Sequence, residues 1–123
     1  MSAAATGADR PHRFPPRFRL RKRREFVALQ RDGRRQTASH FVVITRALAT
    51  PPSRLGITTS RKVGSAPERN RFRRLVREFF RRHRDQLDPP REVLVIARPG
   101  AATLSYADVV QQLSHALALR DVA

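Results

Sequence analysis

Residues 65–84 constrain the fold of this chain more than any other segment. Phe72, Leu75, Val76 and Phe79 recur at the spacing of one face of an α-helix. The opposite side of that helix carries a polar set: Asn70, Arg73, Arg74, Arg77, Arg81 and Arg84. A helix with this pattern packs its apolar side on a core and presents its cations to solvent or to a charged partner.

The charge of this helix is almost uncompensated. Eight arginines lie between Arg69 and Arg84, and Glu78 is the only acid among them. A merely solvated helix face usually carries paired charges of both signs, whereas guanidinium groups match phosphate oxygens. The pattern therefore favours binding to a polyanion over a solvated surface.

Composition supports the same partner class. The 123 residues fit one domain, and 40% of them are hydrophobic, which is enough for a modest core. Lys and Arg number 26 against 10 acids, giving a net charge of +16, and 24 of the cations are arginines. A compact body with this charge repels itself unless a polyanion binds it. The chain has no cysteine, which excludes disulfides, a thiolate nucleophile and thiolate metal ligands.

The N-terminal region predicts a tail rather than a targeting signal. Residues 1–16 are rich in Pro and small residues and read as disordered, and residues 17–123 form the expected domain. No hydrophobic segment suits a secretory signal or approaches the ~20 residues of a membrane span. An organellar transit segment would share this composition, but we expect a cytoplasmic protein. Six cations between Arg17 and Arg24 suggest a flexible basic arm that can itself contact RNA.

Hydrophobic periodicity predicts the order α-β-β-α-β-α and an α+β fold. A first helix is expected over about 23–31, with Gly33 as a left-handed residue after its end. Residues 40–45 and 54–60 read as two strands that form a hairpin. Residues 92–97 are almost continuously apolar and predict a central strand.

Two helix starts carry a capping signal. Ser65 and Glu68 have the spacing of a capping box ahead of the arginine-rich helix. Ser105 and Asp108 repeat that spacing ahead of the last helix. Both pairs therefore predict where their helices begin.

No set of residues suits catalysis by the protein alone. The histidines His12, His40, His83 and His115 are scattered, and none has the spacing of a metal site. Asp85 and Asp88 are too few for a metal pair and suit a solvated helix end. A nuclease needs acids or histidines for metal binding or proton transfer. The chain is therefore predicted to be a binding protein, with neither catalytic residues nor a metal site of its own.

Several segments together form a pattern that is typical of one protein family. The most specific is Arg69-Asn70-Arg71 with the following 72–81, preceded by 60–66, which begins Ser-Arg-Lys-Val-Gly. Leu55-Gly56-Ile57 also fits the family pattern. The weaker matches are Arg19-Leu20, Phe26, Gly33 and Val95-Ile96-Ala97-Arg98-Pro99. Together these segments resemble the protein component of bacterial ribonuclease P, and the resemblance extends roughly from Arg17 to Leu119.

The resemblance implies an α-β sandwich with a small central, four-stranded sheet. It also implies a left-handed βαβ crossover through the arginine-rich helix, against the usual rule for such connections. Only three strands are plain in the sequence. The fourth is expected to be short or to lie around Thr37-Ala38.

The resemblance further implies a subunit of a ribonucleoprotein endonuclease that removes the 5′ leader of precursor tRNA. Its partners would be the catalytic RNA and precursor tRNA, with no membrane and no DNA. Catalysis would belong to the RNA, where Mg²⁺ ions would activate water and stabilise the leaving oxygen.

The family's roles map onto two sets of residues in this chain. The set implied to bind the catalytic RNA is Arg69, Asn70, Arg71, Arg73, Arg74, Arg77 and Arg81. The set implied to lie near the leader is Phe26, Ser60, Arg61, Lys62 and Arg98. Phe26 suits either stacking on a base or core packing, and Asn70 suits either an RNA contact or a local cap.

Two departures from the family pattern concern the leader cleft. Gln30 and Ile44 stand where the family often has aromatic residues. We therefore expect fewer stacking rings in this cleft and more reliance on arginine and on the fit of the backbone.

Three alternative functions suit parts of the sequence. A ribosomal or other structural RNA-binding protein suits the charge and size equally, and only the motifs argue against it. A DNA-binding module would need a helix-turn-helix partner, which is not evident. A nuclease active without RNA is disfavoured by the missing acids.

Overall fold

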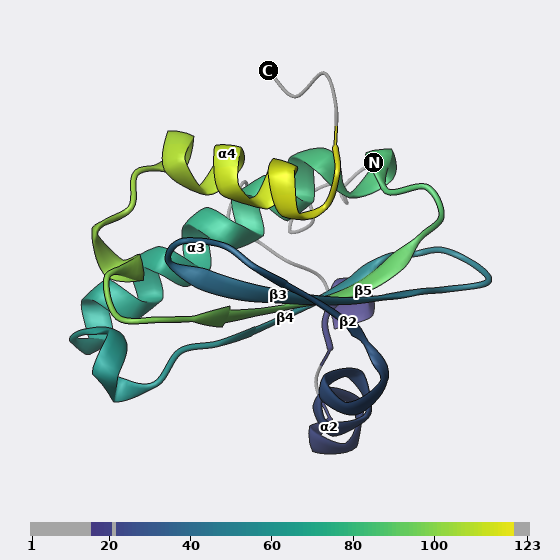
Figure 1. The fold of residues 1–123 in the computed structure, drawn as a ribbon, viewed down its shortest axis with the longest axis horizontal. Helices are drawn as coiled ribbons and strands as arrows, with labels where there is room; N and C mark the ends of the chain where they lie inside the picture. The colour runs from purple at the N-terminus through teal and green to yellow at the C-terminus, as the bar shows by residue number, and fades with distance from the viewer. Residues whose placement is uncertain (1–15, 21, 120–123) are drawn as a thin grey trace, which may run out of the picture.

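A computed structural model describes residues 16–20 and 22–119. Its longer helices are α2 (Arg23–Asp32), α3 (Ala66–His83) and α4 (Tyr106–Ala116), and its strands are β2 (Arg34–Thr37), β3 (Phe41–Ala47), β4 (Arg54–Thr58) and β5 (Arg91–Ala97). Short 3₁₀ turns are η1 (Pro16–Phe18), η2 (Arg61–Val63), η3 (Arg84–Gln86) and η4 (Ala101–Thr103). In Figure 1, α3 and α4 cover one face of the sheet and α2 covers the other, so the α+β fold is a sandwich around a central sheet.

The sheet has the strand order β2-β3-β5-β4. β3 pairs antiparallel with both β2 and β5, whereas β4 pairs in parallel with β5. The prediction that β4 is the hairpin partner of β3 is wrong, because β5 lies between them. β4, α3 and β5 form the parallel βαβ unit to which the family resemblance assigns the left-handed crossover. The central place predicted for β5 is confirmed, with Val93, Leu94 and Val95 almost fully buried.

β2 is the strand that the predicted order omitted. All four of its residues are exposed, so its sequence has no apolar alternation to reveal it. It pairs Arg34 with Thr45 and Thr37 with Val42 at the edge of the sheet. The observed order is therefore α-β-β-β-α-β-α, with the fourth strand ending at Thr37.

Gly33 is extended rather than left-handed, with φ −80° and ψ 163°, so that prediction is wrong. The structure gives a different reason for glycine here. A Cβ atom at this position would lie 2.5 Å from both Ile44 Cγ2 and the Leu29 carbonyl oxygen. The absence of a side chain lets the end of α2 approach the sheet closely.

The predicted helix starts at residues 65 and 105 are confirmed. The Glu68 amide donates to Ser65 Oγ, and the Ser65 amide donates to the Glu68 carboxylate. Ser105 and Asp108 make the same reciprocal pair at the start of α4. The hydrogen bonds to both carboxylates lower the pKa of Glu68 and the pKa of Asp108.

The sheet divides the apolar core into two parts. On the α3 and α4 side, Phe41, Phe72, Val76 and Phe79 are among the buried residues. On the α2 side, the buried residues are Leu20, Leu29, Val42, Ile44 and Leu94. The helices α2 and α3 therefore pack on opposite faces of the sheet, and β4, an edge strand, lies between them.

The chain ahead of α2 lies along β4. The Leu20 amide donates to the Leu55 carbonyl oxygen at 2.9 Å, and Phe18 is buried with 6% exposure. The described part of 17–24 is therefore seated on the sheet or forms the start of α2, which corrects the prediction of a flexible arm. The predicted disorder of 1–16 falls on residues that lie outside the described part, apart from Pro16 in η1.

Among the described residues, no helix has the length and hydropathy that crossing a bilayer requires.

Candidate RNA-binding site

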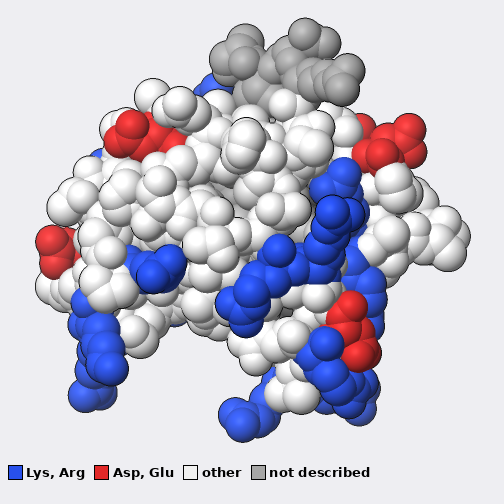
Figure 2. Space-filling model, in the orientation of Figure 1, with Lys and Arg blue, Asp and Glu red and all other residues white. Residues whose placement is uncertain are grey.

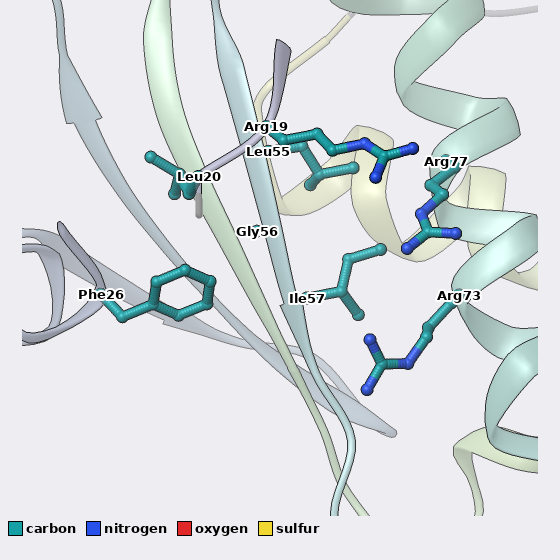
Figure 3. Close-up of a pocket in the computed structure, with 8 residues that line it drawn as sticks. All are labelled: Arg19, Leu20, Phe26, Leu55, Gly56, Ile57, Arg73 and Arg77. Atoms are coloured by element: carbon teal, nitrogen blue, oxygen red, sulfur yellow. The ribbon is translucent and has the colours of Figure 1, made fainter. Parts of the chain in front are cut away.

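A cleft of about 270 Å³ lies over β4, between the segment that leads into α2 and the facing side of α3. The residues that give it its chemistry are Arg19, Phe26, Gly56, Ile57, Arg73 and Arg77. Figure 3 shows Phe26 entering from one side, Arg73 and Arg77 from α3 on the other, and β4 between them. None of the residues that line the cleft is acidic.

The α3 side of the cleft is a cationic wall. Arg73 and Arg77 lie one helical turn apart, and Arg73 Nε donates to Thr59 Oγ1 at 3.1 Å. Burial lowers the pKa of Arg77, and the neighbouring charges of Arg19 and Arg73 lower it further. Three guanidinium groups thus share a partly desolvated space, where an anion would relieve their mutual repulsion.

The α2 side of the cleft is formed by the ring of Phe26. A Cβ atom at position 56 would lie 3.0 Å from Phe26 Cζ and 3.1 Å from Leu20 Cβ, so Gly56 makes room for both side chains. The ring packs against the core on the α2 side and is only partly buried. It also lines a second hollow, together with Gln30 and Thr58. Phe26 therefore belongs both to the packing of α2 and to the wall of the cleft.

A network of ion pairs fixes this wall to the sheet. Arg54, at the start of β4, donates to the Glu25 carboxylate at 2.6 Å and to the Arg19 carbonyl oxygen at 3.1 Å. The buried Glu92 lies between Arg46 at 2.6 Å and Arg54 at 3.7 Å. Because Glu25 precedes Phe26, the network holds the ring and the Arg19 backbone in place relative to β4.

The structure places the polar residues of α3 in different surroundings. Arg73 and Arg77 face the cleft, while the side chains of Asn70 and Arg74 are exposed and make no hydrogen bond to another described residue. Arg69 is partly buried, and its Nε atom has no hydrogen-bond partner among the described residues.

The remaining α3 arginines bind protein oxygens. Arg71 donates to the Ala102 carbonyl oxygen at 3.0 Å. Arg81 and Arg82 both bind Glu78, at 2.8 and 2.6 Å, and these hydrogen bonds lower the pKa of Glu78. The predicted RNA-binding residues therefore do not form one surface. They share the polar side of the helix, but some line the cleft and others bind protein oxygens.

Four of the predicted leader residues lie outside the cleft. Ser60, Arg61 and Lys62 follow β4, and Arg98 follows β5, and all four are exposed. Since β4 and β5 are parallel, these residues lie at the same end of the sheet. The cleft itself joins Phe26 to Arg73 and Arg77, which the resemblance had assigned to different partners.

The departures at Gln30 and Ile44 have different consequences in the structure. Gln30 is exposed beside Phe26, as expected for a position on this surface. Ile44 is 1% exposed beneath α2 and does not line the cleft. The cleft residue that neither predicted site set contains is Arg19. Its signals in the sequence are its place in the basic segment 17–24 and the weak match of Arg19-Leu20 to the family pattern.

The described residues contain no group of three or more His, Cys, Asp or Glu side chains that could hold a metal ion. His83 is buried, with its Nδ1 atom 2.9 Å from the Phe79 carbonyl oxygen. His40 lies 3.2 Å from the Gln112 amide nitrogen. Both histidines thus have packing or hydrogen-bonding roles.

Figure 2, in the orientation of Figure 1, shows that Lys and Arg side chains lie mainly over the lower half of the molecule, both around α2 and at the opposite lower end, whereas the upper part around α4 carries few of them. An α-β sandwich with a cationic, aromatic-walled cleft defines a protein that binds nucleic acid. The family model described as Ribonuclease P matches residues 14–119. The chain belongs to this family.

The relatives and solved structures agree with that assignment. The ribonuclease P protein component of Desulfovibrio desulfuricans is 41% identical over 108 residues, covering 85% of this chain and 83% of the relative. That of Desulforapulum autotrophicum is 40% identical over 100 residues, covering 81% and 86%. The RNase P protein structure from Staphylococcus aureus matches with a TM-score of 0.74 at 30% identity, covering 85% and 96%. The Thermotoga maritima structure matches with a TM-score of 0.73 at 33% identity, covering 85% and 98%.

The protein is therefore the protein subunit of ribonuclease P, an endoribonuclease, and works with the ribonuclease P RNA subunit. The alternative of a ribosomal or other structural RNA-binding protein is not favoured.

Proposed function

We propose that the cleft over β4 binds the single-stranded 5′ leader of precursor tRNA, while the RNA subunit cuts the leader off. The observation that carries this proposal is one cleft with an aromatic ring on one wall, three guanidinium groups and no acid. Proteins that hold single strands combine a cationic groove for the phosphates with rings on which bases stack. Phe26 would stack on a leader base, and Arg19, Arg73 and Arg77 would bind the adjoining phosphates.

The exposed side of α3 would face the RNA subunit. Outside the cleft, Arg69, Asn70 and Arg74 are the members of the predicted set with side-chain groups not already bound to protein oxygens. Arg71 and Arg81 would contribute less, because their guanidinium groups already bind Ala102 and Glu78. Ser60, Arg61, Lys62 and Arg98 would extend the cationic leader surface past the end of β4.

The chemistry would be that of the RNA. Mg²⁺ held at the RNA active site would activate water and stabilise the leaving oxygen. The protein would supply leader binding and neutralise phosphate charge. Since transcription and tRNA processing share one compartment in bacteria, we place the holoenzyme in the cytoplasm.

The test uses Phe26→Ala and Phe26→Tyr in holoenzyme reconstituted with the cognate RNA. Dissociation constants are measured for precursor tRNA and for mature tRNA, alongside the melting temperature of each variant. Stacking on one ring contributes about 1–3 kcal/mol, so the alanine variant should weaken precursor binding by about 5- to 150-fold more than mature-tRNA binding. The tyrosine variant keeps a ring and should be close to wild type.

A control and a contradicting outcome complete this test. The protein without its RNA should leave precursor tRNA uncut, because it lacks a catalytic set of its own. Equal losses of affinity for the two RNAs, together with a lower melting temperature, would reduce Phe26 to a packing residue and refute the leader role.

A further inference from the structure

Three hollows on the surface of the protein adjoin one another through shared lining residues and together make a track that leads away from the leader cleft. The cleft and the second hollow share Phe26. The second hollow shares Arg23 and Val27 with a third, which Arg24, Ala28 and Arg31 complete. A strand lying in the cleft therefore has an open path round α2 to its outer face.

The side chains on this path follow one another round the α2 helix. At about 100° per residue, the order from the cleft outward is Phe26, Gln30, Arg23, Val27, Arg31 and Arg24. The acids of α2 lie on the other side, where Glu25 binds Arg54 on the sheet. The path thus passes from an aromatic wall to a cationic one.

The outer hollow has an apolar floor and a cationic rim. Val27 is 48% exposed, the only large hydrophobic side chain in the described part of the chain that is so exposed. Arg23 and Arg24 form no ion pair with any described residue, whereas Arg31 binds Asp32 at 3.0 Å. Two unneutralised guanidinium groups beside an apolar floor suit the phosphates and sugars of an RNA strand.

The positions of these two arginines are unfavourable for the helix itself. Arg23 and Arg24 are the first two residues of α2, where the helix dipole disfavours positive charge. Replacing them by Gln, a comparable helix former, therefore leaves the helix as stable or makes it more stable. A loss of RNA affinity in such a variant does not arise from unfolding.

We propose that the outer face of α2, with Arg23 and Arg24 at its rim, binds leader nucleotides upstream of those held in the cleft. This inference rests on the proposed leader role of the cleft and extends it. The ligand is the phosphate backbone of single-stranded RNA, which no base sequence restricts. Long leaders are thereby bound more tightly than leaders that end within the cleft.

The test uses holoenzyme reconstituted with the cognate RNA and a series of precursor tRNAs whose leaders grow by one nucleotide at a time. The variant is Arg23→Gln/Arg24→Gln. The matched control is Arg34→Gln/Arg35→Gln on the exposed edge strand β2, which removes the same charge but lines none of the three hollows. Wild type and the control should gain affinity in two stages as the leader lengthens.

The track variant should keep the first stage and lose the second, so that long and short leaders bind alike. For the longest leader, its log-log salt slope should fall by about 0.7 for each lost phosphate contact. Unchanged affinities across the series would show that these arginines are only solvated. Equal losses for every leader and for mature tRNA would show that they bind another RNA surface, and either result overturns the proposal.

The two proposals fail in distinguishable ways. If the cleft does not bind the leader, Phe26→Ala leaves the first stage of the affinity gain intact. If only the track proposal is wrong, Phe26→Ala still weakens the first stage, and Arg23→Gln/Arg24→Gln has no effect on the second.

Discussion

Gly56 is the residue that sets the position of Phe26. A side chain at this position would meet Phe26 and Leu20 more closely than ordinary van der Waals contact, with the nearest atom, Phe26 Cζ, 3.0 Å from the Cβ atom. The cleft therefore depends on a residue that offers RNA no functional group of its own.

We expect Gly56→Val to displace Phe26 and to weaken binding of precursor tRNA more than binding of mature tRNA. Overpacking of this kind costs about 1–3 kcal/mol of stability. Gly33→Ala is the matched control, since its Cβ atom would meet Ile44 and the Leu29 carbonyl away from the cleft. Both variants should have lower melting temperatures. Only Gly56→Val should change the ratio of the affinities for precursor tRNA and mature tRNA. A similar ratio in both would mean that Gly56 acts on stability alone.

At the scale of elements, α3 combines three jobs. Its apolar side holds Phe72, Val76 and Phe79 in the core, Arg73 and Arg77 line the cleft, and Arg81 and Arg82 bind Glu78. The two pairs of arginines carry the same charge but differ in whether an acid already binds them.

We expect Arg73→Ala/Arg77→Ala to weaken RNA binding with the fold intact. Each lost phosphate contact should reduce the salt slope of binding by about 0.7–0.9. The comparison variant Arg81→Ala/Arg82→Ala removes the same charge from the same helix, but its effect should be smaller because both groups already bind Glu78, which neutralises part of their charge. Binding is titrated at several salt concentrations, with circular dichroism as the fold check. Equal slopes for the two variants would contradict the division of α3.

Sequence reasoning predicted the elements that carry a local signal. The capping boxes at Ser65 and Ser105, the apolar stripe of α3 and the buried run of β5 each lie within one segment, so neighbouring residues suffice to reveal them. The sequence predicts a structural role for Gly33, but the role is steric, because a side chain there would collide with Ile44 on another strand. Neighbouring residues in the sequence do not reveal a contact of this kind, which depends on how distant segments pack.

The parts that failed depend on long-range pairing. β2 is an exposed edge strand, so no hydrophobic pattern marks it. β4 pairs with β5 instead of β3. The helix α3 connects β4 to β5 and lets the two strands run parallel, side by side. The cleft joins Arg19, Phe26 and Arg73, and their proximity follows only from that topology.

At the scale of the whole molecule, the net positive charge destabilises the isolated protein and favours its assembly with RNA. The net charge of +16 on 123 residues makes the isolated chain repel itself, and bound RNA removes that repulsion.

We therefore expect sodium chloride to have opposite effects on the protein and on the holoenzyme. The melting temperature of the isolated protein should rise with salt, because the screening length falls from about 10 Å at 0.1 M to about 3 Å at 1 M. Affinity for the RNA subunit should fall over the same range. Calorimetry and binding titrations in chloride check both trends, and a melting temperature that falls steadily with salt would contradict this account.

The strand order also determines when the protein can form during synthesis. β5 is the last described strand to leave the ribosome, yet it occupies the place between β3 and β4. Until it arrives, β4 has no strand to pair with except at its bridge to Arg19, and β3 has one open edge. Open edges invite pairing with other chains, and pairings distant in sequence form slowly. A nascent chain that stalls before Arg91 would thus carry most of the cations but no completed cleft.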